Sequence, residues 1–469
     1  MLKSCSPDSS PTIAENKKWF LLILLLQAIP FLSLLFLPGK AALAFILGIG
    51  GIIFIAFHKE PTFASLLLSI FVVIVLPRAT GRTFFFKVEE IFPLLTIFFL
   101  FLASWEGKTS QIPIGGIGKS LLGFLIVVAF AAFIGCTKGN PKILVFDEMM
   151  MLLLWGIYFI ILKMDIQKKE MKNILLLIIL ASLIVAFYYL YQFWASKGVG
   201  RVCTDQQHIF NFSIPLLFAT FLYERRIMRK VLAVSLTIPM ILAVYVTLTR
   251  ALWLLIPLTL FSQYLYFIKR DIPKRRFHSY LFPILVVIII GLLGLMIFTI
   301  FLGVRGVLGA RFASLKILEY DVSLLARVEL AHYVLERFRK SPLLGVGLAD
   351  FVRYRYFSSP GRPNIYLLDN TYLQLLWKTG IFGLIPFLGM LIFFLRRAWF
   401  ILQKGRSDFD KTLGSSFFFS IFALIITGLE SAILVGYRFN LVWGILAGIT
   451  ELRAREIEKQ ITKNLKYGL

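Results

Sequence analysis

The chain has 469 residues, of which 59% are hydrophobic, and its mean hydropathy is +0.83. Soluble domains are about 45–50% apolar, so the composition excludes an ordinary soluble protein and predicts one that crosses a membrane many times. The formal charge of +25 does not predict a nucleic-acid partner, because most basic residues sit in short segments between apolar runs and form no basic domain.

The apolar runs predict the fold class. A membrane-spanning helix needs about 20 mainly apolar residues, so we expect an all-α polytopic membrane protein with roughly 12–14 transmembrane helices. No small-residue cleavage site follows the first run, so we expect it to be retained as a helix. The candidate spans are residues 19–38, 41–57, 62–77, 91–105, 119–136, 144–162, 173–194, 208–223, 231–248, 251–268, 280–302, 371–395, 413–434 and 437–451.

The positions of Lys and Arg orient these spans, because short cytoplasmic loops carry an excess of both. If the N-terminus is cytoplasmic, alternation places every strongly basic short segment from the sixth span onward on that same side. We therefore expect both termini in the cytoplasm. The expected parts are a cytoplasmic N-terminal tail (1–18), a helix bundle (19–302), a large outer loop containing helices (303–370), C-terminal spans (371–451) and a basic cytoplasmic tail (452–469).

Three arginines stand out because this orientation places them on the outer side, where short loops should lack positive charge. They are Arg201, Arg250 and Arg438. A charge at a helix end can reach the membrane surface at little cost, which is the alternative for each taken alone. Two arginines at the outer ends of consecutive spans nevertheless favour an anionic ligand there, since the guanidinium suits bidentate contact with phosphate.

The outer loop contains a long polar segment in an otherwise apolar chain. Residues 321–340 place five apolar side chains at helical spacing, with Arg327 pointing elsewhere. Ser341-Pro342 and Gly345 end this helix. The last part of the segment begins at Asp369 and re-enters an apolar helix. The five apolar residues are Leu324, Val328, Ala331, Leu335 and Phe338.

In these segments the chain resembles the O-antigen ligase and polymerase family of bacterial envelope glycan enzymes. Order and spacing agree from about residue 172 to the C-terminus. The matching segments are Gly200-Arg201 followed by His208 and Asn211, then Thr249-Arg250-Ala251, Arg327, Ser341-Pro-Leu-Leu-Gly-Val-Gly-Leu-Ala-Asp-Phe351, and Asp369-Asn-Thr-Tyr-Leu-Gln-Leu-Leu-Trp-Lys-Thr-Gly-Ile-Phe-Gly-Leu384.

The resemblance implies a GT-C-like helical glycosyltransferase in the bacterial inner membrane. Such an enzyme moves a glycan from undecaprenyl diphosphate to an acceptor glycolipid or glycan on the periplasmic face, without a nucleotide sugar, metal or other cofactor. It also implies that Arg201 and Arg250 hold the diphosphate and that Arg327 assists. Further residues that could line the site are His208, Asn211, Asn370, Tyr372 and Arg438.

The chain departs from the family pattern where the ligases carry a His as the proposed base. Here Asp369 or Asn370 stands before Tyr-Leu-Gln. Asp369 can serve as the base, since carboxylates commonly act in glycosyl transfer, or it can merely cap the following helix. The family also often has an acidic residue where Lys378 stands. Both departures bear on the identity of the acceptor more than on the identity of the donor.

Several alternatives stay open. A ligase and a polymerase share the donor and differ in the acceptor, and a lipid-glycan flippase or transporter is the alternative from another class. Asp408-Phe-Asp410 has the spacing of a metal–nucleotide site, but it falls in a basic loop and is expected to be solvated charge. The sequence does not decide whether Cys136 and Cys203 pair.

Overall fold

The structure, a computed structural model, describes residues 61–75, 114–164, 166–195, 205–247, 249–271, 322–353, 364–365 and 368–467. The chain divides into two compact units, Met1–Lys108 and Thr109–Leu469. In the first unit the described element is helix α3 (Pro61–Val75), at the predicted span 62–77. The predicted spans 19–38, 41–57, 91–105 and 280–302 lie outside the described residues.

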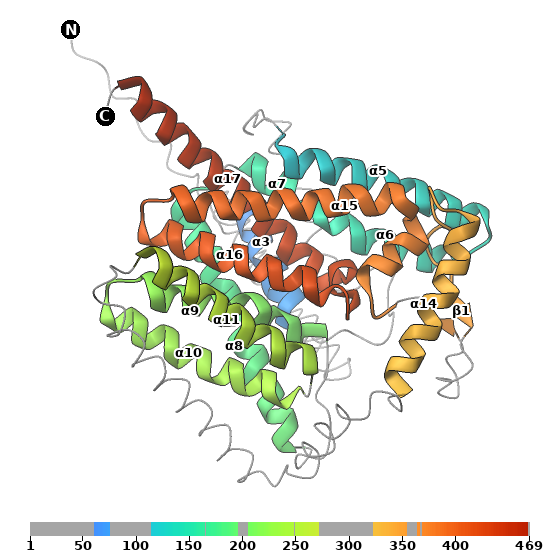
Figure 1. Ribbon diagram of the computed structural model, residues 1–469, viewed down its shortest axis with the longest axis horizontal. Coiled ribbons are helices and arrows are strands. Elements are labelled where there is room, and N and C mark those ends of the chain that lie inside the picture. The colour runs from blue at the N-terminus through green and yellow to red at the C-terminus, as the bar shows by residue number, and fades with distance from the viewer. Residues whose placement is uncertain are drawn as a thin grey trace, which may run out of the picture. The chain divides into compact units, whose positions relative to one another are not determined.

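The second unit is a bundle of helices (Figure 1), and among its described residues two short strands pair with each other. The described 3-10 turns lie at Leu154–Gly156, Asp205–Ile209 and Ala432–Val435. The helices and strands are α5 (Gly116–Thr137), α6 (Lys142–Leu153), α7 (Ile157–Met164), α8 (Lys168–Ala195), α9 (Phe210–Tyr223), α10 (Ile227–Val246), α11 (Arg250–Asp271), α14 (Val322–Lys340), β1 (Val352–Arg353), β2 (Asn364–Ile365), α15 (Thr371–Lys404), α16 (Asp408–Thr427) and α17 (Tyr437–Tyr467).

Seven stretches of the described chain are long and apolar enough to cross a membrane. Each coincides with a predicted span, and α9 and α17 occupy two further predicted spans. The expectation of an all-α polytopic membrane protein is therefore confirmed. The last helix continues to Tyr467, so the segment 452–467 extends the final span as a helix.

Aromatic rings fill the centre of the bundle. Phe387 of α15 packs against Phe124 of α5 and against Trp155, with ring centroids 5.1 and 6.1 Å apart. Trp443 of α17 contacts Phe212 of α9, with centroids 5.9 Å apart. All five side chains are almost completely buried. Such rings bury a large apolar area in defined geometry, which fixes how the helices pack.

The helix ends meet in two groups at opposite ends of the bundle. At one end, called here the loop end, α9, α11, α15 and α17 begin and α5, α8, α10 and α16 finish. The amide of Thr371 at the start of α15 donates to Gly428 O just after α16, at 2.8 Å. The Trp253 indole of α11 donates to Val244 O near the end of α10.

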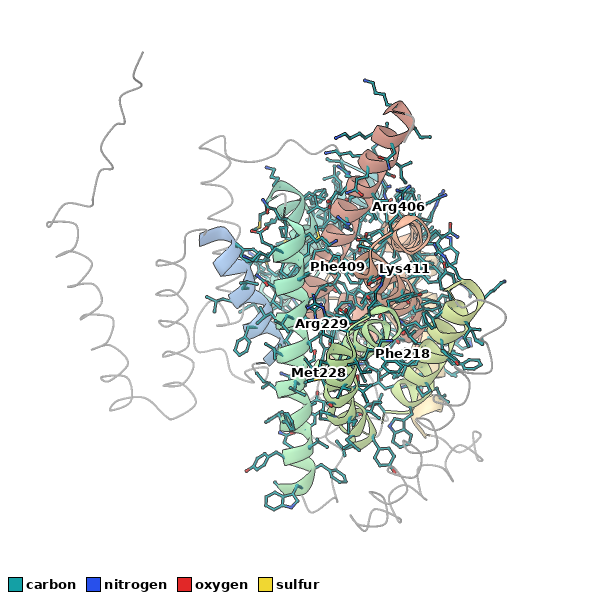
Figure 2. The ribbon with its side chains drawn as sticks, turned by 90° about the vertical axis from the view of Figure 1, so that its left-hand side faces the viewer. Phe218, Met228, Arg229, Arg406, Phe409 and Lys411 are labelled. Carbon is teal, nitrogen blue, oxygen red and sulfur yellow. The ribbon has the colours of Figure 1, made fainter. Side chains whose placement is uncertain are left out.

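The opposite, basic end collects the Lys- and Arg-rich segments that the sequence assigns to one side (Figure 2). The Arg270 guanidinium donates to Leu402 O at 2.6 Å, and Lys168 donates to the Ser407 hydroxyl at 3.3 Å. Arg225 pairs with Asp408 at 3.1 Å. Segments far apart in sequence therefore share this end, as alternation of the spans requires.

The expectation that Asp408 and Asp410 are both solvated is wrong for Asp410. Its side chain is 5% exposed and pairs with Arg453 of α17, at 2.6 Å. It also accepts from the Ser407 amide, while the Ser407 hydroxyl accepts from the Asp410 amide. Asp410 thus completes a capping box at the start of α16, so this acidic residue is part of the fold.

Helix α15 is interrupted at Gly380, where φ is 65° and ψ is −166°. A loop, called here the strap (residues 341–350), fills the interruption. The amides of Val346 and Gly347 donate to Trp377 O and Lys378 O at 2.9 and 3.2 Å. The strap therefore bonds to backbone groups of α15 that a continuous helix would have bonded internally. Backbone groups inside a membrane protein need such partners, because no water is available there.

The strap binds α15 on both sides of the break and also contacts α5. Beyond the break, the amides of Ile381 and Phe382 donate to Pro342 O and Leu343 O. On α5, Ala131 O accepts from Leu348 N at 2.9 Å. Ser341-Pro342 and Gly345 end α14 as the sequence predicts, and the residues after them form an inserted segment.

Helix α14 packs on α15 through Val334, which is fully buried, together with Leu330 and Tyr333. Two residues of the predicted apolar stripe point away from this contact, since Val328 is 55% exposed and Leu335 is 41% exposed. Which side of α14 packs against α15 depends on tertiary contacts, which the spacing of apolar residues cannot predict. Beyond the strap, Val352 pairs with Ile365 in a short antiparallel ladder.

Replacing Gly380 with Ala should destabilise the protein. The backbone conformation at position 380 costs roughly 1–3 kcal/mol for any residue other than Gly. Its Cβ would also lie 2.3 Å from Leu343 O. We expect a lower apparent Tm for the detergent-purified protein.

Gly123→Ala is the matched control, because its Cβ would meet Pro386 at an ordinary 3.7 Å within a regular helix. Its Tm should equal or exceed that of the wild type. Equal Tm values for both variants would contradict the role given to the break.

Candidate functional site

Asp369 and Arg327 face one another at the loop end. Asp369 lies just before α15, and Arg327 lies in the second turn of α14. Their Oδ2 and Nη2 atoms are 3.7 Å apart, and the side chains are 72% and 42% exposed. An exposed ion pair of this length contributes about 0–1 kcal/mol. Both groups can therefore exchange this contact for a charged or polar substrate.

Asn370, and not Asp369, caps α15. The Asn370 carbonyl oxygen Oδ1 accepts from Leu373 N at 2.9 Å, and its Nδ2 donates to Leu429 O at 2.7 Å. Since Asn370 occupies the capping position, the cap alternative for Asp369 fails on geometry. Asp369 keeps an exposed carboxylate that pairs with Arg327.

Tyr372 also lies at the start of α15, but its hydroxyl is engaged. It donates to Ile425 O of α16, at 2.6 Å. Asn370 and Tyr372 thus hold α15 to the end of α16, close in sequence to Asp369. Their polar atoms are engaged in hydrogen bonds within the fold, so we assign Asn370 and Tyr372 the role of positioning the neighbouring Asp369.

The three candidate arginines on helix ends are placed only in part. Arg201 lies outside the described residues, as do the side chains of Arg250 and Arg438. Their backbones are placed: Arg250 is the first residue of α11, and Arg438 is the second residue of α17. Both helices begin at the loop end, where Asp369 lies and α15 also begins.

Gln207 and His208 connect the two helix starts that carry Arg250 and Arg438. Gln207 Oε1 accepts from the Thr249 hydroxyl at 3.0 Å, immediately before Arg250. The His208 ring meets Phe439 edge to face, with centroids 5.7 Å apart, immediately after Arg438. The structure therefore brings together two segments that are far apart in sequence and that both carry an arginine.

His208 and Asn211 are buried at the same place, with exposed fractions of 7% and 1%. Among the described residues, His208 Nδ1 and both amide atoms of Asn211 have no hydrogen-bond partner. Buried polar groups without a partner are destabilising. These atoms can therefore donate to and accept from a polar group at the start of α9.

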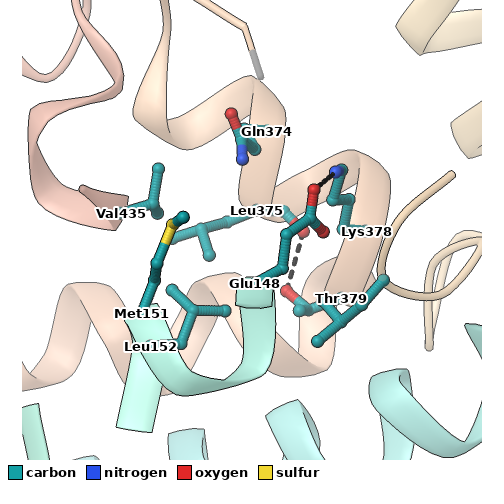
Figure 3. A pocket seen from close by; sticks show the side chains of 9 residues that line it. Glu148, Met151, Leu152, Gln374, Leu375, Lys378, Thr379 and Val435 are labelled. Atoms are coloured by element: carbon teal, nitrogen blue, oxygen red, sulfur yellow. Dashed lines mark hydrogen bonds and ion pairs between the residues drawn. The ribbon is translucent and has the colours of Figure 1, made fainter. Parts of the chain in front are cut away.

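Two charged residues that the site prediction did not include form a buried ion pair. Glu148 of α6 pairs with Lys378 of α15, and the side chains are 9% and 3% exposed (Figure 3). A sequence signal existed, because each is an ionisable residue inside a predicted span and such residues usually require a partner. Sequence alone could not show that they were partners.

The pair lines a small cavity with Thr379, Met151 and Val435 (Figure 3). Its volume is about 10 Å³, which is roughly the space that one water molecule needs. A sugar or a lipid headgroup does not fit this cavity. It is therefore not a substrate pocket in this conformation.

Asp350 of the strap is engaged by two further residues. It accepts two bonds from Arg337, at 3.0 and 3.1 Å, and a third from the Trp377 indole, at 2.9 Å. Burial lowers the pKa of Arg337, but bonds and charge from Tyr333 and Asp350 outweigh it and raise that pKa above the ordinary value. Asp350 therefore has a structural role, since it joins α14 to α15.

Cys136 forms no disulfide with any described residue, and Cys203 lies outside them.

A protein-family model described as O-antigen ligase matches residues 232–388. The match covers α10 from its second turn, α11, α14, the strap and the broken half of α15, and it includes Arg250, Arg327 and Asp369. No curated protein matches the chain.

The two neighbouring residues at the start of α15 should respond differently to replacement. Asn370→Ala removes the cap and the bond to Leu429 O, and loss of a cap costs about 0.5–2 kcal/mol. Asp369→Ala removes an exposed ion pair only. In parallel thermal unfolding, we expect a lower Tm for Asn370→Ala and an unchanged Tm for Asp369→Ala. The reverse order would mean that Asp369 is the structural residue.

Proposed function

We propose that the chain is a glycosyltransferase of the O-antigen ligase family, whose model matches residues 232–388, and that it uses a lipid diphosphate donor at the loop end. The donor is a glycan on undecaprenyl diphosphate, and the acceptor is a hydroxyl of a glycolipid or glycan. The observation that carries the proposal is the exposed Asp369–Arg327 pair, at the end where the helix bearing Arg250 begins.

The proposed reaction balances with these groups. The acceptor oxygen attacks the anomeric carbon, and the bond from that carbon to the phosphate oxygen breaks. The electron pair leaves with the diphosphate, whose charge Arg250, Arg201 and Arg327 neutralise. Asp369 takes the proton of the acceptor hydroxyl as general base. Its exposed carboxylate can reach an acceptor because the cap of α15 is supplied by Asn370.

The proposed setting is the bacterial inner membrane. The basic end faces the cytoplasm and the loop end faces the periplasm, with both termini in the cytoplasm. The supporting observation is that basic segments from four separate turns of the chain share one end of the bundle, and positive charge is concentrated in cytoplasmic loops.

A transporter or flippase is the second candidate, because α15 is broken beside a buried ion pair and transporters use broken helices of this kind. Three observations weigh against it. The strap occupies the backbone groups at the break, Glu148 and Lys378 neutralise one another, and the cavity is of water size. We therefore favour the enzyme.

The decisive variant is Asp369→Asn in purified protein given lipid-linked glycan and acceptor. Loss of a general base should lower turnover by on the order of 10²–10⁴-fold, with unchanged Tm. Arg250→Ala and Arg201→Ala should also abolish transfer. Asp408→Asn and Arg225→Ala, a pair at the basic end, are the matched controls and should keep full activity. Full turnover by Asp369→Asn would refute the assignment of the base.

A strain lacking the protein separates ligase from polymerase. For a ligase, long glycan should accumulate on undecaprenyl diphosphate while the acceptor core stays bare. For a polymerase, single repeat units should remain on the carrier or on the core. Gel comparison of the lipid-linked and envelope fractions reads both pools. Normal levels of both would contradict the proposed donor and acceptor class.

A further inference from the structure

The Glu148 carboxylate makes two contacts with two different parts of the fold. One oxygen pairs with Lys378, and the other accepts from the Ala349 amide of the strap, at 2.8 Å. Ala349 has a φ of 57°, which residues with a side chain rarely adopt. The surroundings must hold this conformation, and the bond from Glu148 is a contact that does so.

The next residue of the strap carries the connection to α14. Asp350 accepts from the indole of Trp377, which precedes Lys378, and from Arg337 of α14. Arg337 is held in turn by the Tyr333 hydroxyl at 2.9 Å. Asp350 thus joins α15 to α14, while the preceding residue, Ala349, is bound to Glu148 of α6.

Helix α14 connects Arg337 with the candidate site, because it also carries Arg327. Arg327 lies ten residues before Arg337 on the same helix, which is about 15 Å along its axis. A helix is stiff over that length, so the orientation of α14 at Arg337 sets where Arg327 lies relative to Asp369. The exposed Arg327–Asp369 contact is too weak to set it.

We propose that Glu148 is a positioning residue, which holds α14 through Ala349, Asp350 and Arg337 so that Arg327 faces Asp369. Its catalytic meaning rests on the proposed function, whereas its effect on the position of α14 does not. The bond to Ala349 N performs the positioning, and the pairing with Lys378 neutralises a charge that the bundle would otherwise bury alone.

Two double variants separate these roles. In Glu148→Gln/Lys378→Met, both charges are gone and an amide oxygen can still accept from Ala349 N. In Glu148→Met/Lys378→Met, both charges and the acceptor are gone. Replacing a buried ion pair by apolar groups of similar volume is often neutral for stability. We expect Glu148→Gln/Lys378→Met to have a Tm near that of the wild type. Glu148→Met/Lys378→Met should have a lower Tm, because the buried Ala349 amide loses its acceptor. The single variant Glu148→Gln should also have a lower Tm, because Lys378 loses its charged partner.

The readout is the distance between spin labels on α14 and α15, attached at His332→Cys and Ile392→Cys, both exposed, after Cys5, Cys136 and Cys203 are replaced by Ser. We expect one narrow distance in the wild type and in Glu148→Gln/Lys378→Met. In Glu148→Met/Lys378→Met we expect a broadened or shifted distance and at least a tenfold loss of kcat. A narrow distance and full turnover in that variant would overturn the proposal.

Arg337→Gln cuts the same connection at a partly exposed residue, outside the bundle interior. It tests the proposal if the variant lacking the acceptor does not fold, and it should broaden the distance in the same way. An unchanged distance would overturn the proposal. If Asp369→Asn proves fully active while the distances change as expected, the proposed function fails and the positioning role stands.

Discussion

The structure depends on the insertion of the strap into the break of α15. A helix interrupted within an apolar bundle exposes amide and carbonyl groups that have no water to bind. Here the strap supplies partners on both sides of Gly380 and also bonds to α5. The only residue type that fits this backbone at Gly380 is glycine, since a Cβ would lie 2.3 Å from a strap carbonyl. The break and the strap therefore require each other.

Because the strap follows α14 directly, its insertion also determines where α14 lies. Asp350 joins α14 to α15 through Arg337 and Trp377, and the start of α15 carries Asp369. The part of this segment that is hydrogen-bonded to α15 is thus the strap and the end of α14. The exposed Asp369–Arg327 pair lies beside it and can exchange partners, as the proposed catalytic role would require.

The two ends of the bundle use charge differently. At the basic end, Arg397 of α15 and Arg455 of α17 both bind the fully buried Glu451, and Arg453 binds Asp410. Each of these charges has a partner, and together they tie the last three helices. At the loop end, the Asp369–Arg327 pair is exposed and long, and His208 and Asn211 keep unused hydrogen-bonding atoms among the described residues. The first arrangement suits a scaffold, and the second suits ligand binding.

Composition and spacing were sufficient for the fold class, for the spans that the structure describes and for the grouping of basic segments, because these follow from local hydropathy and from alternation. They also singled out Asp369 and Arg327, which the structure brings together. They could not distinguish Asp369 from Asn370 as the cap, or find that Asp410 is buried by Arg453. They also could not pair Glu148 with Lys378, or show that Val346 and Gly347 complete a broken helix. Each of these facts is a contact between residues distant in sequence or a choice between neighbouring side chains, and only the packing of the helices decides which contact forms.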